Sequence, residues 1–463
     1  MPRSASRVFL VSVILAATFA ACAPTPLTAT PPQFTEEAQT RVTPSLTSAP
    51  VNTVSADAVS LNGVTIMVWH PWFGVEASLL ETQVAKFNSS NEWGISVLTS
   101  SQSNYTELFN NVTGALAAPE KPNLVIGLPE HALYWDERNG VVDLTPYVTD
   151  PKWGLSEADI ADFPSVFWKQ DQVGVKRLGL PAERTTRLIF YNETWARELG
   201  FTAPPTTPED FQKQACAANK ALRANNDSKD DALGGWYVDA DPMTPLSWML
   251  AFGGGAQEGE SYRFLTPGNI EAFRFVKTLF EAGCAWQSAS AIPTDEFAAR
   301  HALFISGSLE DFSAQSRALN TLASADQWTV LPFPGKASET VVVYGSSFIM
   351  LPSTEAEQLA TWLFVRWMLS PENQADWVQT TGLFPLRNST MTRVADYAAT
   401  HPQWVDAVKL LPYGQGTPQL ASWRQIRVAL GDGFDFMFRI NLPVGQVATI
   451  LAQLDTAVKD LTK

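Results

Sequence analysis

The residues from Val64 to Ile126 alternate between strand-like and helix-like patterns, and this alternation restricts the fold more than any other feature. Short apolar runs at 64–69, 95–98 and 124–126 predict strands. Between them, apolar side chains recur with the period of an α-helix over two segments, which predicts amphipathic helices. Continuous apolar strands separated by helices indicate a parallel sheet covered on both faces. The loops after these strands are where we expect a ligand site.

The stretch 178–192 predicts a crossing between two such units. Two apolar runs flank a short polar patch at 183–186, and Pro181 resists helix formation because its ring fixes φ. A semi-rigid strap of this kind would let two lobes rock against each other. Asn192 is placed to cap a helix that Gly200 would end. A new structural layer is therefore expected to begin at this helix.

The chain beyond the strap also shows strand and helix patterns. Capping residues followed by proline predict that helices begin at Thr207, Thr266 and Ser370. Other segments are predicted as strands at 328–331 and 341–344, as a helix over 354–369, and as a mostly helical part over 387–463 with a Gly/Pro-rich break at 412–418. The second lobe is therefore expected to be α/β as well.

Length and charge narrow the class of protein. A chain of 463 residues is longer than a domain with a single hydrophobic core usually is, which favours two or three compact units. The chain has 47 acidic and 32 basic residues and no basic run. Because a surface with this excess of acid repels phosphate backbones, nucleic acid is not an expected partner.

The N-terminus predicts export. Basic residues precede an apolar run over 8–21 that is too short to span a bilayer, so residues 1–21 are predicted to be a signal peptide. Small residues directly before Cys22 resemble a bacterial lipoprotein cleavage site, which would place a lipid on Cys22 and anchor the chain to the outer face of the cell membrane. Simple secretion with an incidental cysteine is the alternative. Residues 22–60 are rich in Thr, Pro, Ala and Ser and are expected to form a flexible linker.

Cys216 and Cys284 remain after the leader. In an exported chain such a pair is a candidate disulfide, and two separate buried thiols are the alternative. Neither cysteine has a histidine or cysteine companion at metal-ligand spacing, so no metal and no cofactor is expected.

Several sequence segments resemble, in the same order along the chain, segments of the extracellular solute-binding proteins of bacterial ABC importers, of the large maltose-binding and glycerol-phosphate-binding type. These segments are residues 69–76, 142–147, 188–192, 362–372 and 381–387. The resemblance covers nearly everything from residue 62 to the end. It implies an α/β, two-lobed periplasmic-binding-protein-like fold of type II, in which each lobe is a mainly parallel sheet flanked by helices and a multi-segment hinge joins them. The implied lobes are 61–184 with 340–386 at the N-terminal side, and 187–332 with 387–463 at the C-terminal side.

The resemblance carries over to single residues unevenly. Trp423 falls where the maltose binder stacks a tryptophan on a sugar ring, and Glu130 falls where both types place a ligand-contacting acid. Tyr105 matches a ligand tyrosine of the glycerol-phosphate type. Gln419 and Met243 stand where that type has its phosphate-site arginine and a cleft tryptophan, which argues against phosphate recognition.

Leu309 stands where the maltose binder has a second stacking tryptophan, which argues against maltose itself as the ligand.

A sugar needs flat aromatic rings for its C–H faces and carboxylates or amides for its hydroxyls. The candidate ligand-binding residues are Trp72, Phe73, Phe384 and Trp423 as platforms, Glu76, Glu130 and Asp241 as acceptors, Tyr105, Thr185 and Met243 along the cleft, and Gly345 and Gly382 for close backbone approach.

Each assignment has a structural alternative. Trp423 could pack between helices, Glu130 could only cap its helix, and both glycines could serve ordinary turns. Arg184 and Arg387 could pair with acids near the strap or meet an anionic ligand.

The function that the resemblance implies is that of a monomeric substrate-binding lipoprotein, which captures a sugar or oligosaccharide and delivers it to an ABC permease. Binding of glycerol phosphate or another small polar solute on the same fold is the main alternative, and a sensory adaptor that reports ligand occupancy is another. An envelope glycoside hydrolase is a further alternative, but no nucleophile elbow or metal-binding histidine pair supports an enzyme.

Overall fold

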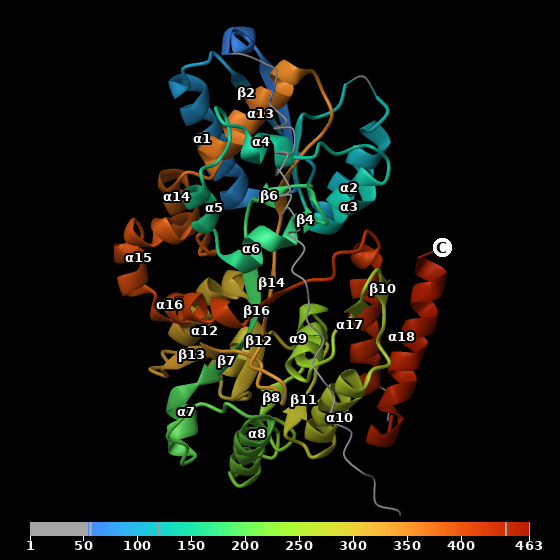
Figure 1. Cartoon of the computed structure of the whole chain (residues 1–463). Helices are drawn as coiled ribbons and strands as arrows, with labels where there is room; N and C mark the ends of the chain where they lie inside the picture. The colour runs from blue at the N-terminus through green and yellow to red at the C-terminus, as the bar shows by residue number, and fades with distance from the viewer. Residues whose placement is uncertain (1–53, 55–57, 119, 440–441, 463) are drawn as a thin grey trace, which may run out of the picture. The chain divides into compact units, whose positions relative to one another are not determined.

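The computed structural model describes residues 54, 58–118, 120–439 and 442–462. The predicted signal peptide and Cys22 lie outside these residues, as does most of the predicted linker. Two separate sheets organise the described part of the chain (Figure 1). Within it, no helix combines the length and the apolar character that crossing a membrane requires.

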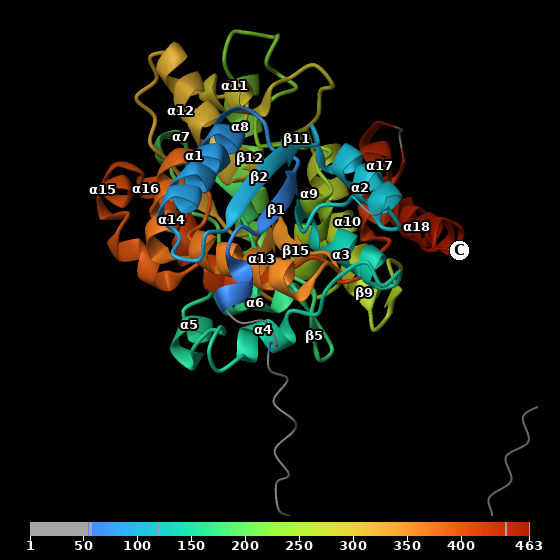
Figure 2. The ribbon, with the colours of Figure 1, turned by 90° about the horizontal axis from the view of Figure 1, so that it is seen from above.

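The first sheet has the predicted βαβαβ start. Its strands β1 (Thr65–His70), β2 (Ser96–Ser101), β3 (Leu124–Gly127), β6 (Leu180–Pro181) and β15 (Ser347–Met350) lie in the order β2-β1-β3-β15-β6. β1 pairs in parallel with β2 and β3, while β15 runs antiparallel to β3. Helices α1 (Gly74–Ser90), α2 (Tyr105–Ala115) and α13 (Glu355–Met368) pack against it (Figure 2). α1 buries Leu80, Val84 and Phe87, as its period predicts.

The second sheet is mixed, which differs from the expected mainly parallel sheet. Its strands are β7 (Thr185–Asn192), β8 (Trp236–Tyr237), β11 (Ala285–Trp286), β12 (Phe304–Gly307), β13 (Trp328–Leu331), β14 (Val341–Tyr344) and β16 (Gly414–Gly416). β8 is parallel to β11 and β12, and β14 is parallel to β16. However, β7 runs antiparallel to β12, β13 and β14. β7 enters directly from the first sheet, so no βαβ crossover sets its direction.

Two crossings between the sheets lie against each other. One joins β6 to β7 through residues 182–184, and the other joins β14 to β15 through Gly345 and Ser346. The backbone N–H groups of Ala182 and Glu183 donate to the Ser346 carbonyl at 2.9 and 3.2 Å. Since β14 belongs to the second sheet, the return crossing comes a few residues after the predicted boundary at 340.

Gly345 permits this contact between the crossings. Its φ is +149°, and a Cβ there would lie 2.3 Å from the Glu183 carbonyl oxygen. Only glycine fits such an approach without displacement.

The predicted helix caps are confirmed. The Asn192 side chain accepts from Trp195 N at 2.9 Å at the start of α7 (Glu193–Glu198). Side chains of Thr207, Thr266 and Ser370 cap helices whose first residue is proline, namely α8 (Pro208–Arg223), α10 (Pro267–Glu281) and α14 (Pro371–Thr381). The other helices used below are α3 (Pro129–Asp136), α6 (Ser165–Gln170), α9 (Met243–Ala251), α17 (Trp423–Arg439) and α18 (Val447–Leu461).

Two details complete the comparison with the predicted elements. Cys216 of α8 and Cys284, which follows α10, form a disulfide, so the pairing prediction is confirmed. The segment 412–418 is not only a break, because β16 within it pairs with β14.

Candidate functional site

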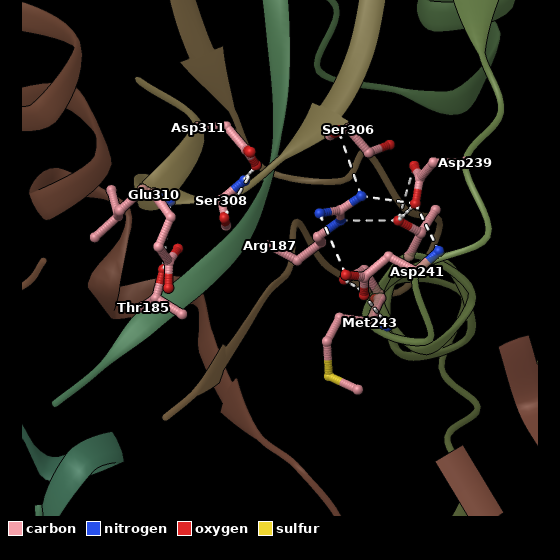
Figure 3. A network of polar contacts seen from close by, with 12 residues as sticks. Thr185, Arg187, Asp239, Asp241, Met243, Ser306, Ser308, Glu310 and Asp311 are labelled. Carbon is pink, nitrogen blue, oxygen red and sulfur yellow. Dashed lines mark hydrogen bonds and ion pairs between the residues drawn. The ribbon is translucent and has the colours of Figure 1, made fainter. Parts of the chain in front are cut away.

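Polar side chains from both sheets meet beside the crossings. Tyr105, at the start of α2, donates its hydroxyl to Glu183 Oε1 at 2.7 Å. Thr185, at the start of β7, donates its hydroxyl to Glu310 Oε2 at 2.8 Å (Figure 3). We call the following residues the crossing cluster: Tyr105, Glu183, Thr185, Arg187, Asp239, Asp241, Glu310, Asp311 and Tyr344.

Loops after strands supply much of this cluster, as expected for an α/β fold. Tyr105 follows β2 in the first lobe. In the second lobe, Asp239 and Asp241 follow β8, and Glu310 follows β12. The crossing cluster therefore draws on both lobes and on the strap between them.

Arg187 on β7 occupies one side of the cluster. Its Nη2 lies 2.6 Å from Asp239 Oδ1, its Nη1 lies 3.7 Å from Asp241 Oδ2, and its Nε donates to Thr244 Oγ1 at 2.9 Å (Figure 3). Burial alone would lower the pKa of Arg187, but these carboxylates outweigh it and raise the pKa. The Arg187 guanidinium therefore stays positively charged and forms ion pairs with both Asp239 and Asp241.

Glu183 sits in a crowded environment. Burial raises the pKa of its carboxyl, and the nearby charge of Glu310 raises it further. The hydroxyls of Tyr105 and Ser346 and the indole N–H of Trp72 act on this carboxyl as hydrogen-bond donors and oppose the shift. Trp72 and Ser346 are buried, with 7% and 0% exposure. Three neutral donors therefore surround the Glu183 carboxyl.

Glu310 and Tyr344 face the same region. Glu310 keeps contact with water, but protein surrounds it on most sides, and this burial raises the pKa of its carboxyl. Burial also raises the pKa of Tyr344, and the charges of Glu310 and Asp241 add to the effect. Burial and the charge of Glu183 likewise raise the pKa of Tyr105, so at neutral pH both tyrosines of the cluster carry neutral hydroxyls.

A second contact between the lobes lies between α3 and α17. Arg427 Nη1 of α17 is 3.4 Å from Oε1 of Glu130, which is buried on α3. Burial raises the pKa of Glu130, and Arg427 opposes this shift. The Arg424 guanidinium lies 4.2 Å from the centre of the Phe109 ring of α2. These contacts connect helices of the two lobes next to the crossing cluster.

Trp423 begins α17 in the same neighbourhood. Its ring stacks beside Tyr262 at 6.3 Å and is 1% exposed. A cavity of about 850 Å³ adjoins it, lined by α3, by the start of α17 and by the end of α18. Tyr134, Tyr262 and Arg424 are among its lining residues.

The structure brings some candidate residues together and separates others. Tyr105, Thr185 and Asp241 belong to the crossing cluster, and Met243 starts α9 with its backbone N–H donating to Asp241 Oδ1 at 2.8 Å. Phe73 is 76% exposed before α1, which also carries the partly exposed Glu76 in its first turn.

Phe384 does not offer the open platform that was expected. Its ring is fully buried and packs against Phe167 at 5.8 Å, and only its backbone N–H reaches the strap, where it donates to Arg184 O at 3.1 Å. Trp72 is also mostly buried, with its ring 4.7 Å from that of Trp377. Gly382 ends α14 in the left-handed conformation, as a helix stop requires.

The two arginines left open by the sequence pair with acids. Arg184 Nη2 is 2.8 Å from Asp171 Oδ2 in the interior, and Arg387 lies 2.6 Å from Asp159 and 2.8 Å from Asp162. Gln419 donates its side-chain amide to the carbonyls of residues 169 and 170 at 2.9 and 3.1 Å.

Sequence reasoning did not single out Glu183, Arg187, Asp239, Glu310 or Tyr344 as site residues. Glu183 was visible as part of the polar patch in the strap. Glu310 could have been found as the first acid after the strand at 304–307. Asp239 follows a strand of only two residues, which leaves no periodic signal.

Comparisons with known proteins were made on sequence and on structure. The model of the family described as bacterial extracellular solute-binding protein matches residues 82–413. No curated protein matches the chain.

Several solved structures share the fold. MalE from Xanthomonas citri, described as a sugar-binding protein, has a TM-score of 0.73 at 20% identity, over 86% of this chain and 97% of that one. The cyclic alpha-maltosyl-1,6-maltose binding protein from Arthrobacter globiformis has a TM-score of 0.70 at 16% identity, over 85% and 98%. UgpB from Mycobacterium tuberculosis, in complex with glycerophosphocholine, has a TM-score of 0.68 at 16% identity, over 86% and 99%.

Proposed function

Because this chain belongs to the bacterial extracellular solute-binding protein family, we propose that it captures a sugar or oligosaccharide and delivers it to the permease of an ABC importer. The observation that carries this proposal is the crossing cluster, in which hydroxyls and carboxylates of both lobes meet at the strap. A solute that bridges these groups would hold the two lobes together.

The chemistry of the cluster suits the hydroxyls of a sugar. Glu183, Asp241 and Glu310 accept hydrogen bonds, and a hydrogen bond to a charged group contributes about 1.5 to 3 kcal/mol. Phe73 is exposed after β1 and can cover an apolar ring face. After an association cost of about 4 kcal/mol or more, a few such contacts reach about −8 kcal/mol, which corresponds to micromolar affinity.

Binding would act through the closure of the lobes. A ligand that contacts both lobes only when they are closed shifts the equilibrium by its difference in affinity for the two states. The pair of Glu130 and Arg427 joins α3 to α17 and would stabilise the closed state. We propose that no bond of the solute is broken, that the protein acts as a monomer, and that a lipid on Cys22 keeps it at the membrane.

A phosphate ester fits the cluster less well. Arg184 forms an ion pair with Asp171, and Arg187 forms ion pairs with Asp239 and Asp241. Gln419 is bonded to backbone carbonyls of residues 169 and 170 and carries no charge. The cations nearest the strap are therefore already neutralised.

Thermal-shift screening of the purified protein tests the proposal, because a bound ligand raises the melting temperature by mass action. The panel contains neutral mono- and oligosaccharides, glycerophosphodiesters and inorganic phosphate. The molecular mass of each sugar that binds is measured by mass spectrometry after its recovery from the protein. We expect a sugar to raise the melting temperature and to be recovered intact. A response to phosphate esters alone, or new reducing ends in the recovered sugar, would contradict the proposal.

A further inference from the structure

A cavity of about 850 Å³ lies outside the crossing cluster, between α3 of the first lobe and the ends of α17 and α18 of the second. This volume falls within the roughly 300 to 1,000 Å³ that small-molecule sites in proteins usually have. The hairpin of β9 (Gln257–Glu258) and β10 (Ser261–Tyr262) supplies a further wall. Both lobes therefore line this cavity, as they line the cluster, but with different residues.

Two tyrosine rings of the lining are held in place by their neighbours. The Tyr262 ring lies nearly parallel to the buried ring of Trp423, with 6.3 Å between the ring centres and 21° between the planes. The Tyr134 ring of α3 has the Arg138 guanidinium 3.6 Å from its centre and the Phe109 ring 4.9 Å away. Both tyrosines are half-buried and line the cavity. Fixed, partly exposed aromatic rings suit the apolar C–H faces of a sugar.

The lining also carries hydrogen-bond donors. Across the described residues, neither Arg424 nor Lys459 has an ion pair or a side-chain hydrogen bond, so the N–H groups of both are available to a ligand. The Ser422 hydroxyl donates to the Tyr262 hydroxyl at 3.2 Å, which leaves the Tyr262 hydroxyl proton available as well. Donors of this kind match the hydroxyl and ring oxygens of a sugar.

The charges of the lining balance, which favours a neutral ligand. Its three cationic and three acidic side chains are Arg138, Arg424, Lys459, Glu137, Glu260 and Asp455. Asp455 accepts from the backbone N–H groups of Phe264 and Leu265 at 2.6 and 3.1 Å, and Glu137 lies 3.3 Å from Arg138. The cavity therefore suits hydroxyl groups better than a phosphate or a carboxylate.

Helices α2 and α3 connect the cavity to the crossing cluster. The Tyr105 ring of the cluster lies 6.4 Å from the ring of His131, in the first turn of α3. Tyr134 lies one turn further along α3, and Phe109, one turn after Tyr105, lies beside it. Because a helical turn is about 5 Å long, the cavity begins roughly that far beyond the cluster. Arg424 stands at the border, with its guanidinium 4.2 Å from the centre of the Phe109 ring.

We propose that this cavity is a second subsite for the same solute, and that the solute is a neutral oligosaccharide. Its rings extend from the crossing cluster into the cavity, where they lie against Tyr262 and Tyr134. A monosaccharide would occupy the cluster alone. This inference rests on the proposed function and specifies the class of sugar.

The dependence of affinity on chain length tests the inference, by isothermal titration calorimetry on the purified protein. The probes run from the monosaccharide to the hexasaccharide, as glucose oligomers in α-1,4, α-1,6, β-1,3 and β-1,4 linkage and as β-1,4-linked mannose and xylose oligomers. We expect at least one series in which an oligosaccharide binds roughly tenfold or more tightly than its monosaccharide.

Alanine variants assign this gain to the cavity. We expect Tyr262→Ala and Tyr134→Ala each to weaken binding of the tightest oligosaccharide roughly tenfold, while sugars that reach only the cluster keep their affinity. A general folding defect would weaken both kinds of sugar alike. Because the two tyrosines belong to different lobes, a variant that fails to fold leaves the other as the test. Tyr413→Ala, which removes an exposed ring outside the cavity, is the matched control and should bind like the wild type.

The outcomes separate this inference from the proposed function. If the monosaccharide binds as tightly as every oligomer, or if both alanine variants bind the tightest oligosaccharide like the wild type, the cavity is not a subsite and sugar binding at the cluster stands. If no sugar of any length binds, the proposed function is wrong and the inference fails with it.

Discussion

Replacing Arg184 by methionine should loosen the two crossings on which the site is built. The Arg184 side chain is fully buried. Its Nη1 donates to the carbonyl oxygens of Glu183 and Ser346, and its Nη2 donates to Asp171 Oδ2 at 2.8 Å and to Ser347 Oγ at 3.2 Å. The Arg184 guanidinium thus links the crossing at residues 182–184 to the crossing at residues 345–346 through hydrogen bonds.

The size of the effect follows from which groups lose their partners. The Ser346 carbonyl still accepts from the backbone N–H groups of Ala182 and Glu183, so it stays satisfied. Asp171 is 4% exposed and would lose its only ion-pair partner among the described residues. Breaking a buried pair on one side costs about 3 to 5 kcal/mol, so Arg184→Met should lower the free energy of unfolding by about that amount.

Urea unfolding followed by tryptophan fluorescence measures this loss. Replacing Asp171 by asparagine in the same chain should restore part of the stability, because it removes the unpaired charge. Arg138→Met is the control, since Arg138 is half-exposed and its contacts are an ion pair with the exposed Glu137 and the ring and carbonyl of Tyr134 one turn away, and it should change stability by about 1 kcal/mol or less. The reasoning is refuted if Arg184→Met costs less than about 1 kcal/mol, or if the double variant is no more stable than the single one.

Three further predictions concern the same architecture. Because the folded state raises the pKa of Glu183, its protonated form is favoured by folding and stability falls as pH rises above the ordinary glutamate pKa. Glu183→Gln should therefore gain stability over the wild type at neutral pH but not near about pH 4, and a pH-independent difference would contradict this. Serine at both Cys216 and Cys284, which are 68 residues apart, should cost about 2 to 4 kcal/mol in urea unfolding, whereas an unchanged midpoint would show that the bridge adds nothing. Gly345→Ala should cost about 1 to 3 kcal/mol because its Cβ would meet the Glu183 carbonyl, while Gly114→Ala, with open space around it in α2, should be neutral or stabilising.

Local patterns predicted the elements of this fold well. The period of the apolar residues located α1 through Leu80, Val84 and Phe87, and capping residues located the starts of α7, α8 and α10. These features depend on residues close together in the chain, so the sequence alone contains the information.

Features that depend on distant residues could not be predicted in the same way. The antiparallel direction of β7 is set by its partners β12, β13 and β14, which lie more than a hundred residues later. The ring of Phe384 is buried because it packs against Phe167, and a contact between residues so far apart in the chain cannot be predicted from a local pattern. Glu310 joins Glu183 only because the strap brings the two lobes together, so its place in the cluster needs the tertiary structure.

A crystal structure of the protein with its best-binding sugar tests the central claim most directly. We predict that the sugar lies within hydrogen-bond distance of both Glu183 and Glu310, with groups of both lobes in contact. A sugar found only in the 850 Å³ cavity beside α18, with neither carboxylate touching it, would contradict the account.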